Sequence, residues 1–568
     1  MIGFFHSRRD PLADARTAQR WMSSGLSSDT LAMHGELMAA LARISAPAAK
    51  LTRRRLAALF VVDAHADQLF RSLTAQYIEH ANRSAKIERQ LWTALSDLTN
   101  AFLTAYQAYA HEVEQRASRW QTQLAELLCR QIVHRGRDAK ARLYRYESWM
   151  PGKWAELHGL LAMATSRQLE RHPVQLVPER AATTIEHQYL MILALQLIDT
   201  GNLTPRQIEQ VWQELDGWCA QLRLSLAPKT VTSFYVDLAG REGLRRRTHG
   251  ALEGSVLFVD THSLHALMQQ QQASLQHEIR SHSRFADTAR MAEQLSLLNR
   301  FAVKVDPDYK PLARRGEREA ISGEADAIVG LTKIASYLRE EDRDPDFQLQ
   351  ADHSYGRSTD IAVFGRFRSE GDRQVELARH RLAQYAAAGP WEMKDMSATG
   401  FRLIAPMKSA SVFPIGMLVA IRPSLDAKWT LGIVRRMRRQ TSDRTEVGLQ
   451  VVASSIAGVD LIEQRRSAGA DYMVNGEEGL INGRSYVALF LTLKRSDSNP
   501  GVQSLIVPAS EYQQGKRLTL VTSKAIYRVV LGGPIEQQPE WVWTAVEPQE
   551  IGTQFIVPDV RNASSGAH

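Results

Sequence analysis

The chain has 568 residues, of which 44% are hydrophobic and 23% are charged, so it is too long for one core and too apolar to be disordered. Its two cysteines, Cys129 and Cys219, exclude a disulfide framework, and no apolar run approaches the roughly 20 residues that span a bilayer. The formal net charge of +8 is modest, but its arginine clusters suit anionic partners. The first residues lack the apolar segment of a signal peptide, so we expect a cytoplasmic protein without a membrane span.

Residues 1–228 are predicted to form one or more helical domains. The clearest pattern runs from Ala85 to Arg130, where apolar residues recur in steps of 4, 4 and 3, the period of a straight α-helix. A continuous helix of this length carries an apolar stripe that other helices or a partner must cover. The segment NLTPRQIEQVWQEL predicts a further helix, with Thr204 as N-cap, Pro205 at the first position and Gln207 at the third.

Residues 229–305 are predicted to form a small α/β unit, because the apolar period changes to 2 from about Val231. Within this unit, Leu244–Met268 has the same order of features as Leu312–Leu338. Each segment has an arginine cluster, a polar loop, a short strand and an amphipathic helix. A true repeat would make residues 229–305 a second, degenerate barrel-like unit, whereas a coincidental likeness would leave the two segments unrelated.

The next part of the chain is predicted to be rich in strands. In the segment EMKDMSATGFRLIA, an acid, a hydroxyl and a glycine (Asp395, Ser397 and Gly400) lie between two strand-like runs. The runs GMLVAIRP, WTLGIVRRMRR and EVGLQVVA follow, as expected for a small antiparallel barrel. We expect AGVDLIEQRRSAGAD to end this unit as a helix, residues 471–555 to form a β-rich extension, and residues 556–568 to be a disordered tail.

The pattern Asp395-x-Ser397-x-x-Gly400, with the strands after it, resembles the PilZ-domain family over roughly residues 312–460. The resemblance implies a six-stranded antiparallel barrel that binds cyclic di-GMP, a bacterial second messenger. In that family the Asp and the Ser contact guanine edges, and an upstream Arg-x-x-x-Arg completes the site. The chemistry agrees, because a carboxylate accepts from adjacent guanine N–H groups, and glycine permits close backbone approach or positive φ.

Two arginine pairs precede the motif. Arg339 and Arg343 enclose three acidic residues, which would repel an anionic ligand. The other group consists of Arg314, Arg315 and Arg318. It precedes a predicted strand, ADAIVGL, and requires a helical insertion between that strand and the motif, at about 332–390. We prefer this group, because it is richer in arginine and precedes a strand as the family's motif does; arginine pairs with phosphate oxygens and stacks on purines. The predicted residues that bind cyclic di-GMP are therefore Arg314, Arg315, Arg318, Asp395, Ser397 and Gly400.

The predicted fold class is α+β, with an all-helical N-terminal half and a β-rich half that contains the PilZ-like barrel at 306–470. We expect a non-enzymatic bacterial signalling protein, in which cyclic di-GMP binding is transmitted to a helical half that binds a protein partner or self-associates. The alternative is a structural adaptor whose degenerate barrel no longer binds nucleotide.

Other classes of function find little support in the sequence. It contains no phosphate-binding loop, nucleophile elbow, dinucleotide fingerprint or zinc motif, so we expect no catalytic residue, metal or cofactor. Four arginines near residue 437 could contact nucleic acid, but alternation along a strand would split them between two faces. They are Arg435, Arg436, Arg438 and Arg439.

Overall fold

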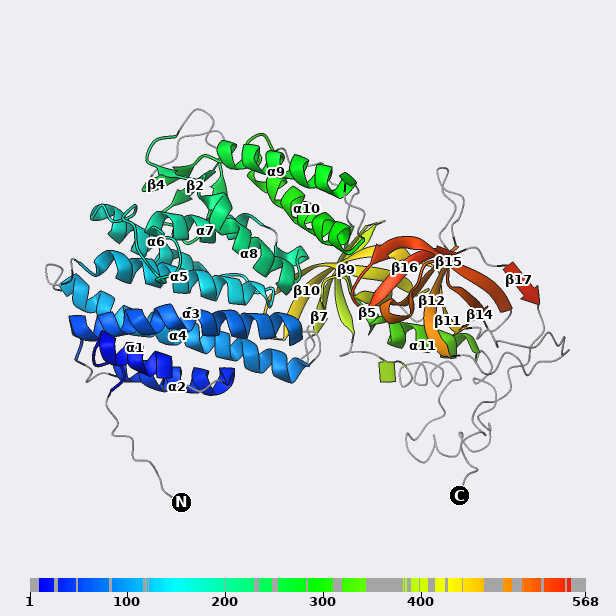
Figure 1. Ribbon diagram of the computed structural model, residues 1–568. Coiled ribbons are helices and arrows are strands. Elements are labelled where there is room, and N and C mark those ends of the chain that lie inside the picture. The colour runs from blue at the N-terminus through cyan, green and yellow to red at the C-terminus, as the bar shows by residue number, and fades with distance from the viewer. Residues whose placement is uncertain are drawn as a thin grey trace, which may run out of the picture. The chain divides into compact units, whose positions relative to one another are not determined.

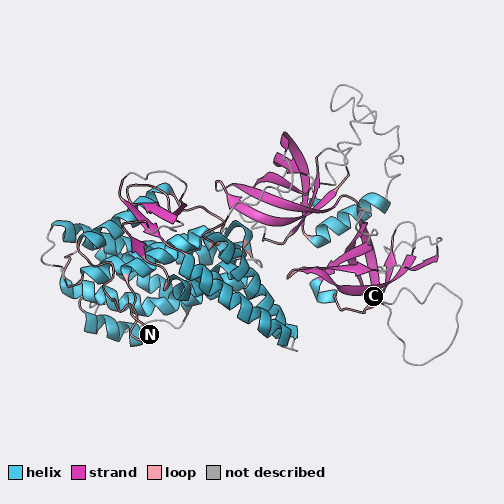
Figure 2. Cartoon of the chain, turned by 90° about the horizontal axis from the view of Figure 1, so that it is seen from above, coloured by secondary structure: helices cyan, strands magenta, loops and turns pink. Residues whose placement is uncertain are grey.

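Helices make up the first part of the chain and strands most of the second (Figure 1, Figure 2). The computed structural model describes residues 10–24, 29–46, 50–80, 84–115, 120, 122–198, 200–228, 234–247, 254–281, 285–309, 319–343, 382, 384–385, 390–397, 399–406, 414–423, 428–441, 443–463, 484–492, 503–522, 526–546 and 549–552. These residues divide into two units, with the main division between Ala313 and Arg314. The predicted α+β class, with a helical half before a β-rich half, is confirmed.

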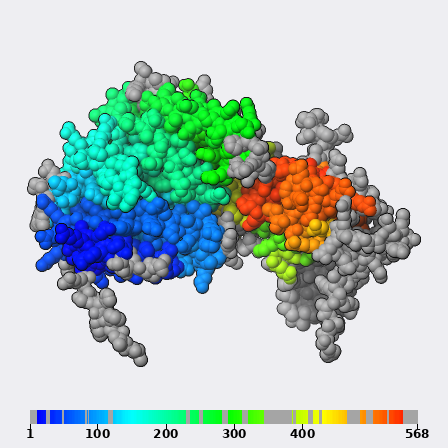
Figure 3. All heavy atoms as spheres, viewed as in Figure 1, coloured from blue at the N-terminus to red at the C-terminus, as the bar shows by residue number. Residues whose placement is uncertain are grey.

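The first unit is a bundle of helices with a small sheet. In Figures 1 and 3, its first two helices and its last two lie on opposite sides of the unit. The capping box predicted at Thr204 is present, since Thr204 and Gln207 exchange side-chain and backbone hydrogen bonds at 3.0 and 3.3 Å. The helices are α1 (Ala15–Ser24), α2 (Thr30–Ile44), α3 (Arg53–His80), α4 (Ala85–Gln115), α5 (Leu124–Leu143), α6 (Pro151–Ser166), α7 (Ile185–Leu197), α8 (Pro205–Cys219), α9 (His262–Ser281) and α10 (Phe285–Val305), with a short 3₁₀ turn, η2, at Thr200–Asn202.

The prediction of a single long helix from Ala85 to Arg130 is wrong. The chain forms two helices, α4 and α5, which pack against each other. Trp120 lies between them in sequence, is fully buried, and meets the ring of Tyr109 edge-on with centroids 5.7 Å apart. The apolar stripe thus continues through a turn that buries a tryptophan, and α2, α3 and α5 cover α4 within the unit. Self-association through this stripe stays a prediction.

A four-stranded sheet packs on the helices of the first unit. Its strand order is β1-β4-β2-β3, and it is open rather than closed. Leu257 and Val259 of this sheet belong to the same buried core as the residues of α7. The segment Leu244–Met268 supplies β3, β4 and the start of α9, so it forms no barrel. The strands are β1 (Leu224–Ser225), β2 (Phe234–Asp237), β3 (Arg245–Arg246) and β4 (Val256–Val259).

The second unit begins with the predicted six-stranded antiparallel barrel. Its strands close in the order β10-β7-β6-β5-β8-β9. The first helix of the predicted insertion is present as α11 (Leu331–Arg343), whereas most of the second, RQVELARHRLAQYAAAG, lies outside the described residues. The strands are β5 (Glu319–Val329), β6 (Trp391–Ser397), β7 (Gly400–Pro406), β8 (Leu418–Arg422), β9 (Thr430–Arg439) and β10 (Arg444–Ala453).

A second barrel follows where we expected only a β-rich extension. Its strands close in the order β11-β12-β13-β16-β15-β14, and β17 adds to β15. The second barrel has the same strand connectivity as the first. The two barrels are therefore the tandem related units, rather than Leu244–Met268 and Leu312–Leu338. The strands are β11 (Ile456–Glu463), β12 (Ser485–Thr492), β13 (Gln503–Pro508), β14 (Arg517–Val521), β15 (Ile526–Gln537), β16 (Trp541–Val546) and β17 (Gln549–Gly552), with a 3₁₀ turn, η4 (Ala509–Glu511), after β13.

The prediction of a helix for AGVDLIEQRRSAGAD is also wrong, because the first half of this segment forms β11. Val459 and Leu461 alternate into the interior of the second barrel and are at most 1% exposed. This strand opens the second barrel instead of closing the first.

Helix α11 packs between the two barrels. It contacts β11 and β12 of the second barrel as well as β5 and β8 of the first. Its residues Ile334 and Ala335 are fully buried in a core that also contains Leu418 of the first barrel and Leu489 of the second. The two barrels therefore share apolar packing through α11.

We expect Gly458→Ala to loosen this packing. A Cβ at Gly458 would lie 2.1 Å from the carbonyl oxygen of Ala335 and 2.7 Å from the amide nitrogen of Arg339, both in the backbone of α11. Overpacking of this kind costs about 1–3 kcal/mol or more, so chemical denaturation should show a lower unfolding midpoint. Gly323→Ala is the control, since its Cβ would meet Met393 at an ordinary 3.5 Å. Equal midpoints for the two variants would contradict the close packing.

Candidate ligand-binding site

The Asp-x-Ser-x-x-Gly motif forms a tight hairpin between β6 and β7. Ser397 ends β6 and pairs with Gly400, the first residue of β7. The hydroxyl of Ser397 lies 3.4 Å from the carbonyl oxygen of Gly400 and donates to it. Thr399 in the turn accepts a backbone hydrogen bond from Val451 of β10 at 3.0 Å. The hairpin is thereby anchored to a third strand of the barrel.

Asp395 lies on β6 directly across from Arg402 on β7. The Arg402 Nε atom lies 2.6 Å from Asp395 Oδ2, and the Asp395 side chain is only 11% exposed. The Arg402 side chain is 45% exposed, so this ion pair borders solvent. A guanidinium group presents adjacent N–H donors to a carboxylate, as the Watson–Crick edge of guanine does.

Gly400 is required for close approach rather than for positive φ. A Cβ at this position would lie 2.6 Å from the carbonyl oxygen of Leu449 in β10. Because that oxygen belongs to the backbone, no side-chain rotation would relieve the clash. The sequence allowed either close backbone approach or a positive φ at this glycine, and the structure supports close approach.

The start of β5 lies beside the motif. Glu319 pairs with Met396 and Ala320 pairs with Asp395. The preferred arginines, Arg314, Arg315 and Arg318, lie outside the described residues. Strand β5 itself begins at Glu319. The chain therefore enters β5 at the end of the barrel that carries Asp395 and Ser397.

The other arginine pair lies on α11. Arg339 Nη1 pairs with Asp460 Oδ1 of β11 at 2.6 Å, and the Arg339 side chain is 28% exposed. Arg339 thus links α11 to the second barrel, which favours the structural role over ligand binding. The side chain of Arg343 lies outside the described residues.

The arginine cluster in β9 is split, as alternation predicts. Arg436 and Arg438 are exposed, whereas Met437 between them is 3% exposed. Arg435 forms a bidentate pair with Glu536 of β15, at 2.8 and 2.6 Å. One of these arginines thus holds the two barrels together and is occupied by a carboxylate.

The matching hairpin of the second barrel differs in sequence. Because the barrels share their connectivity, the β12–β13 connection corresponds to the β6–β7 hairpin. That connection reads Ser496-x-Ser498-x-x-Gly501 and has no carboxylate at the position of Asp395. It lies outside the described residues, and its one carboxylate, Asp497, takes the place of Met396 rather than that of Asp395.

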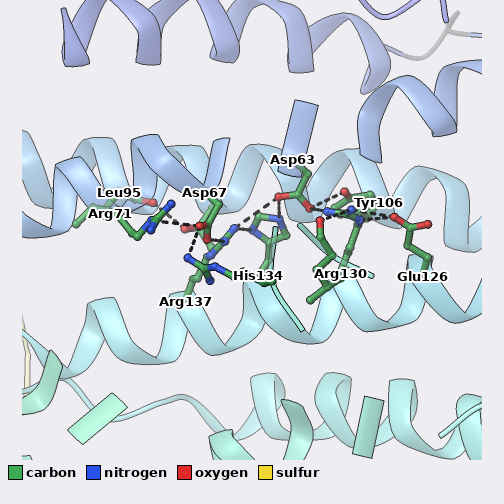
Figure 4. A network of polar contacts seen from close by, with 12 residues as sticks. Asp63, Asp67, Arg71, Leu95, Tyr106, Glu126, Arg130, His134 and Arg137 are labelled. Atoms are coloured by element: carbon green, nitrogen blue, oxygen red, sulfur yellow. Dashed lines mark hydrogen bonds and ion pairs between the residues drawn. The ribbon is translucent and has the colours of Figure 1, made fainter. Parts of the chain in front are cut away.

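A second polar cluster lies inside the helical unit (Figure 4). Asp63 on α3 accepts hydrogen bonds from Tyr106 Oη at 2.7 Å and His134 Nε2 at 3.0 Å, and it pairs with Arg130 Nη1 at 3.1 Å. Arg137 Nη1 lies 3.6 Å from the same carboxylate. Asp63, Arg130 and His134 are each at most 5% exposed, so these charges interact with little screening by water.

The pKa values in this cluster follow from burial and charge. Burial alone would raise the pKa of Asp63, but its contacts with His134 and Arg130 outweigh it and hold that pKa well below its usual range. Burial lowers the pKa of His134 despite the neighbouring carboxylate. We assign the neutral tautomer in which Nε2 donates to Asp63 while Nδ1 faces Arg137 Nη1 at 3.5 Å. Asp63 therefore carries a full charge at neutral pH.

This cluster was not predicted, although the helical spacing of its charged residues is visible in the sequence. Asp63 and Asp67 are four residues apart on α3, and Arg130, His134 and Arg137 follow at steps of four and three on α5. Such spacing places each set on one helix face. Arg402 was also missed, although its register with Asp395 follows directly from a two-residue hairpin.

The described part of the chain has neither a candidate metal site nor a membrane-spanning helix. No group of three or more His, Cys, Asp or Glu side chains there could hold a metal ion. Of the helices described, none is both long and apolar enough to cross a bilayer.

Residues 16–229 match a family model described as the N-terminal domain of the cyclic-di-GMP receptor FimW. No curated protein and no solved structure matched the chain. The match covers the helical region, where the sequence had suggested no resemblance, and ends before the first barrel.

Proposed function

We propose that the chain is a non-enzymatic cyclic di-GMP receptor that binds the dinucleotide at the β6–β7 hairpin of its first barrel. The observation that carries this proposal is the pairing of Asp395 with Arg402, a partly exposed group with the donor pattern of a guanine edge. The likeness of residues 16–229 to the N-terminal domain of a cyclic-di-GMP receptor supports the same ligand.

In this proposal the two halves of the site come from the motif and from the segment before β5. Asp395 and Ser397 contact a guanine edge, and Gly400 keeps the hairpin close to β10. Arg314, Arg315 and Arg318 supply guanidinium groups for the phosphates and for stacking on the purines. The register of β5 against β6 supports this assignment, because it brings Ala320 next to Asp395.

The arginine segment also offers a route for signal transmission. In sequence, this segment lies between the helical unit and β5, because the main division of the chain falls at residues 313 and 314. A ligand held by these arginines would fix the connection between the two units. We propose that this changes how the helical unit presents itself to a protein partner or to a second copy.

Isothermal titration calorimetry on the full chain tests the receptor proposal. We expect saturable binding of cyclic di-GMP with a Kd of about 10 μM or tighter, equivalent to at least about 7 kcal/mol. Guanosine monophosphate serves as the comparator and should bind at least about tenfold more weakly, because it offers one base and one phosphate group. Folded protein that gives no binding heat with cyclic di-GMP would reject the proposal and favour the adaptor alternative.

A further inference from the structure

The helical unit contains a cavity next to the polar cluster of Asp63. Its volume is about 520 Å³, within the range of about 300–1,000 Å³ for small-molecule sites. Helices α3, α5, α7 and α8 and the segment before α7 contribute to its lining. The proposed barrel site does not involve this cavity.

Part of the cavity lining is rich in arginine. Asp67 accepts from three guanidinium groups, with Arg71 Nε at 3.2 Å, Arg137 Nη2 at 3.0 Å and Arg180 Nη2 at 2.7 Å. Arg71 is 66% exposed and Arg180 is 51% exposed, whereas Asp67 is 11% exposed. Over the whole lining, five cationic and four anionic side chains leave one positive charge in excess, which favours an anion. The two exposed arginines can turn to a ligand while Arg137 keeps Asp67 paired.

The lining also includes an aromatic ring and hydrogen-bonding side chains. Trp212 lines it, and the indole lies against α5 because Gly136 has no side chain; a Cβ there would be 3.0 Å from the ring. The amides of Gln188 and Gln213 line the same cavity. Indole rings stack on planar heterocycles, and amides both donate and accept hydrogen bonds.

The cavity lining also carries a buried cation, Lys140. Lys140 Nζ pairs with Glu209 at 2.6 Å and lies 5.4 Å from the ring centroid of Trp212. Burial lowers the pKa of Lys140, although Glu209 opposes this shift. Lys140 and Glu209 border the open space of the cavity, and an apolar occupant would add to the desolvation cost of these charges, whereas a polar one would not. The arrangement fits a polar occupant.

We propose that this cavity is a second ligand site, which takes a small molecule with a phosphate group and a planar heterocycle. The phosphate lies between Arg71 and Arg180, and the heterocycle lies against Trp212. A mononucleotide has this chemistry. The site goes beyond the proposed function of the barrel, because none of its residues belongs to the second unit.

Calorimetry on the full chain carrying Asp395→Ala tests this site, since that substitution weakens the proposed barrel site, and the dependence on Arg71 and Arg180 identifies binding in the cavity. The probes are guanosine monophosphate, pyrophosphate, guanosine and cyclic di-GMP. We expect guanosine monophosphate to bind at least tenfold more tightly than guanosine. The double variant Arg71→Gln/Arg180→Gln, added to Asp395→Ala, should weaken this binding at least tenfold. Arg206→Gln is the control, because Arg206 is exposed on α8 and does not line the cavity.

Each outcome decides the proposal. Binding of any phosphate-bearing probe that depends on Arg71 and Arg180 supports it, and if the probe is cyclic di-GMP, the dinucleotide also has a site in the helical unit. Absence of saturable binding for every probe up to about 10 mM, a very weak affinity, overturns it. Binding that is equal in the double variant and the Arg206→Gln control also overturns it. Circular dichroism at the working temperature confirms that each variant is folded.

Discussion

The double substitution Arg314→Ala/Arg318→Ala is expected to abolish measurable binding of cyclic di-GMP. Each arginine would lose a charge-assisted contact with the ligand, worth about 1.5–3 kcal/mol. Two such losses amount to at least about 3 kcal/mol, which lowers the affinity at least about 100-fold. Calorimetry with the full chain measures the change directly.

The matched control for this prediction is Arg339→Ala. Arg339 is committed to Asp460 of the second barrel, so its loss should change the affinity for cyclic di-GMP less than about threefold while weakening the contact between α11 and β11. The reverse pattern, in which Arg339→Ala abolishes binding and Arg314→Ala/Arg318→Ala does not, would place the ligand against α11.

Asp63→Asn is expected to destabilise the helical unit by about 3–5 kcal/mol, because it leaves Arg130 and Arg137 without their shared buried carboxylate. Chemical denaturation monitored by circular dichroism measures the loss. The control is Asp216→Asn, whose side chain is 73% exposed and pairs with His187 at 2.9 Å. An exposed pair of this kind contributes about 0–1 kcal/mol. Equal losses in the two variants would contradict the account of the buried cluster.

The effect of Asp63→Asn should also depend on pH. The folded-state pKa of Asp63 is held well below its usual range, so its contribution is fully present above the unfolded-state value of about 3.9. This contribution is lost as the pH falls below that value. The difference in stability between the native protein and Asp63→Asn should therefore be constant from pH 7 to pH 5 and should narrow by pH 3.

Much of the β-rich half could be predicted where strands alternate and turns are marked. The hairpin between Ser397 and Gly400 and the closed first barrel followed from period-2 runs separated by turn residues. The second barrel was missed because its first strand was read as a helix. Short apolar runs such as that of Val459 and Leu461 fit either period, and only their pairing with β12 and β14 decides between the two structures.

Tertiary packing also decided features of the helical unit. The apolar period from Ala85 to Arg130 was real, but it could not show the turn at Trp120, which the packing of α4 on α5 stabilises. The polar cluster joins Asp63 of α3 to Arg130 and His134 of α5, more than sixty residues away in sequence. Helical spacing shows which residues share a face, but it does not show which faces meet.

The most direct test of the proposed receptor compares two substitutions on β6. Asp395→Ala removes the carboxylate that would read guanine, whereas Glu392→Gln changes a carboxylate of the same strand that is paired with Lys394 and Arg444. Calorimetry with cyclic di-GMP should show at least about tenfold weaker binding for Asp395→Ala, the effect of one lost charge-assisted hydrogen bond. Glu392→Gln should bind as the unmodified chain does. Equal affinities for Asp395→Ala and the unmodified chain would contradict the claim that the β6–β7 hairpin binds the dinucleotide.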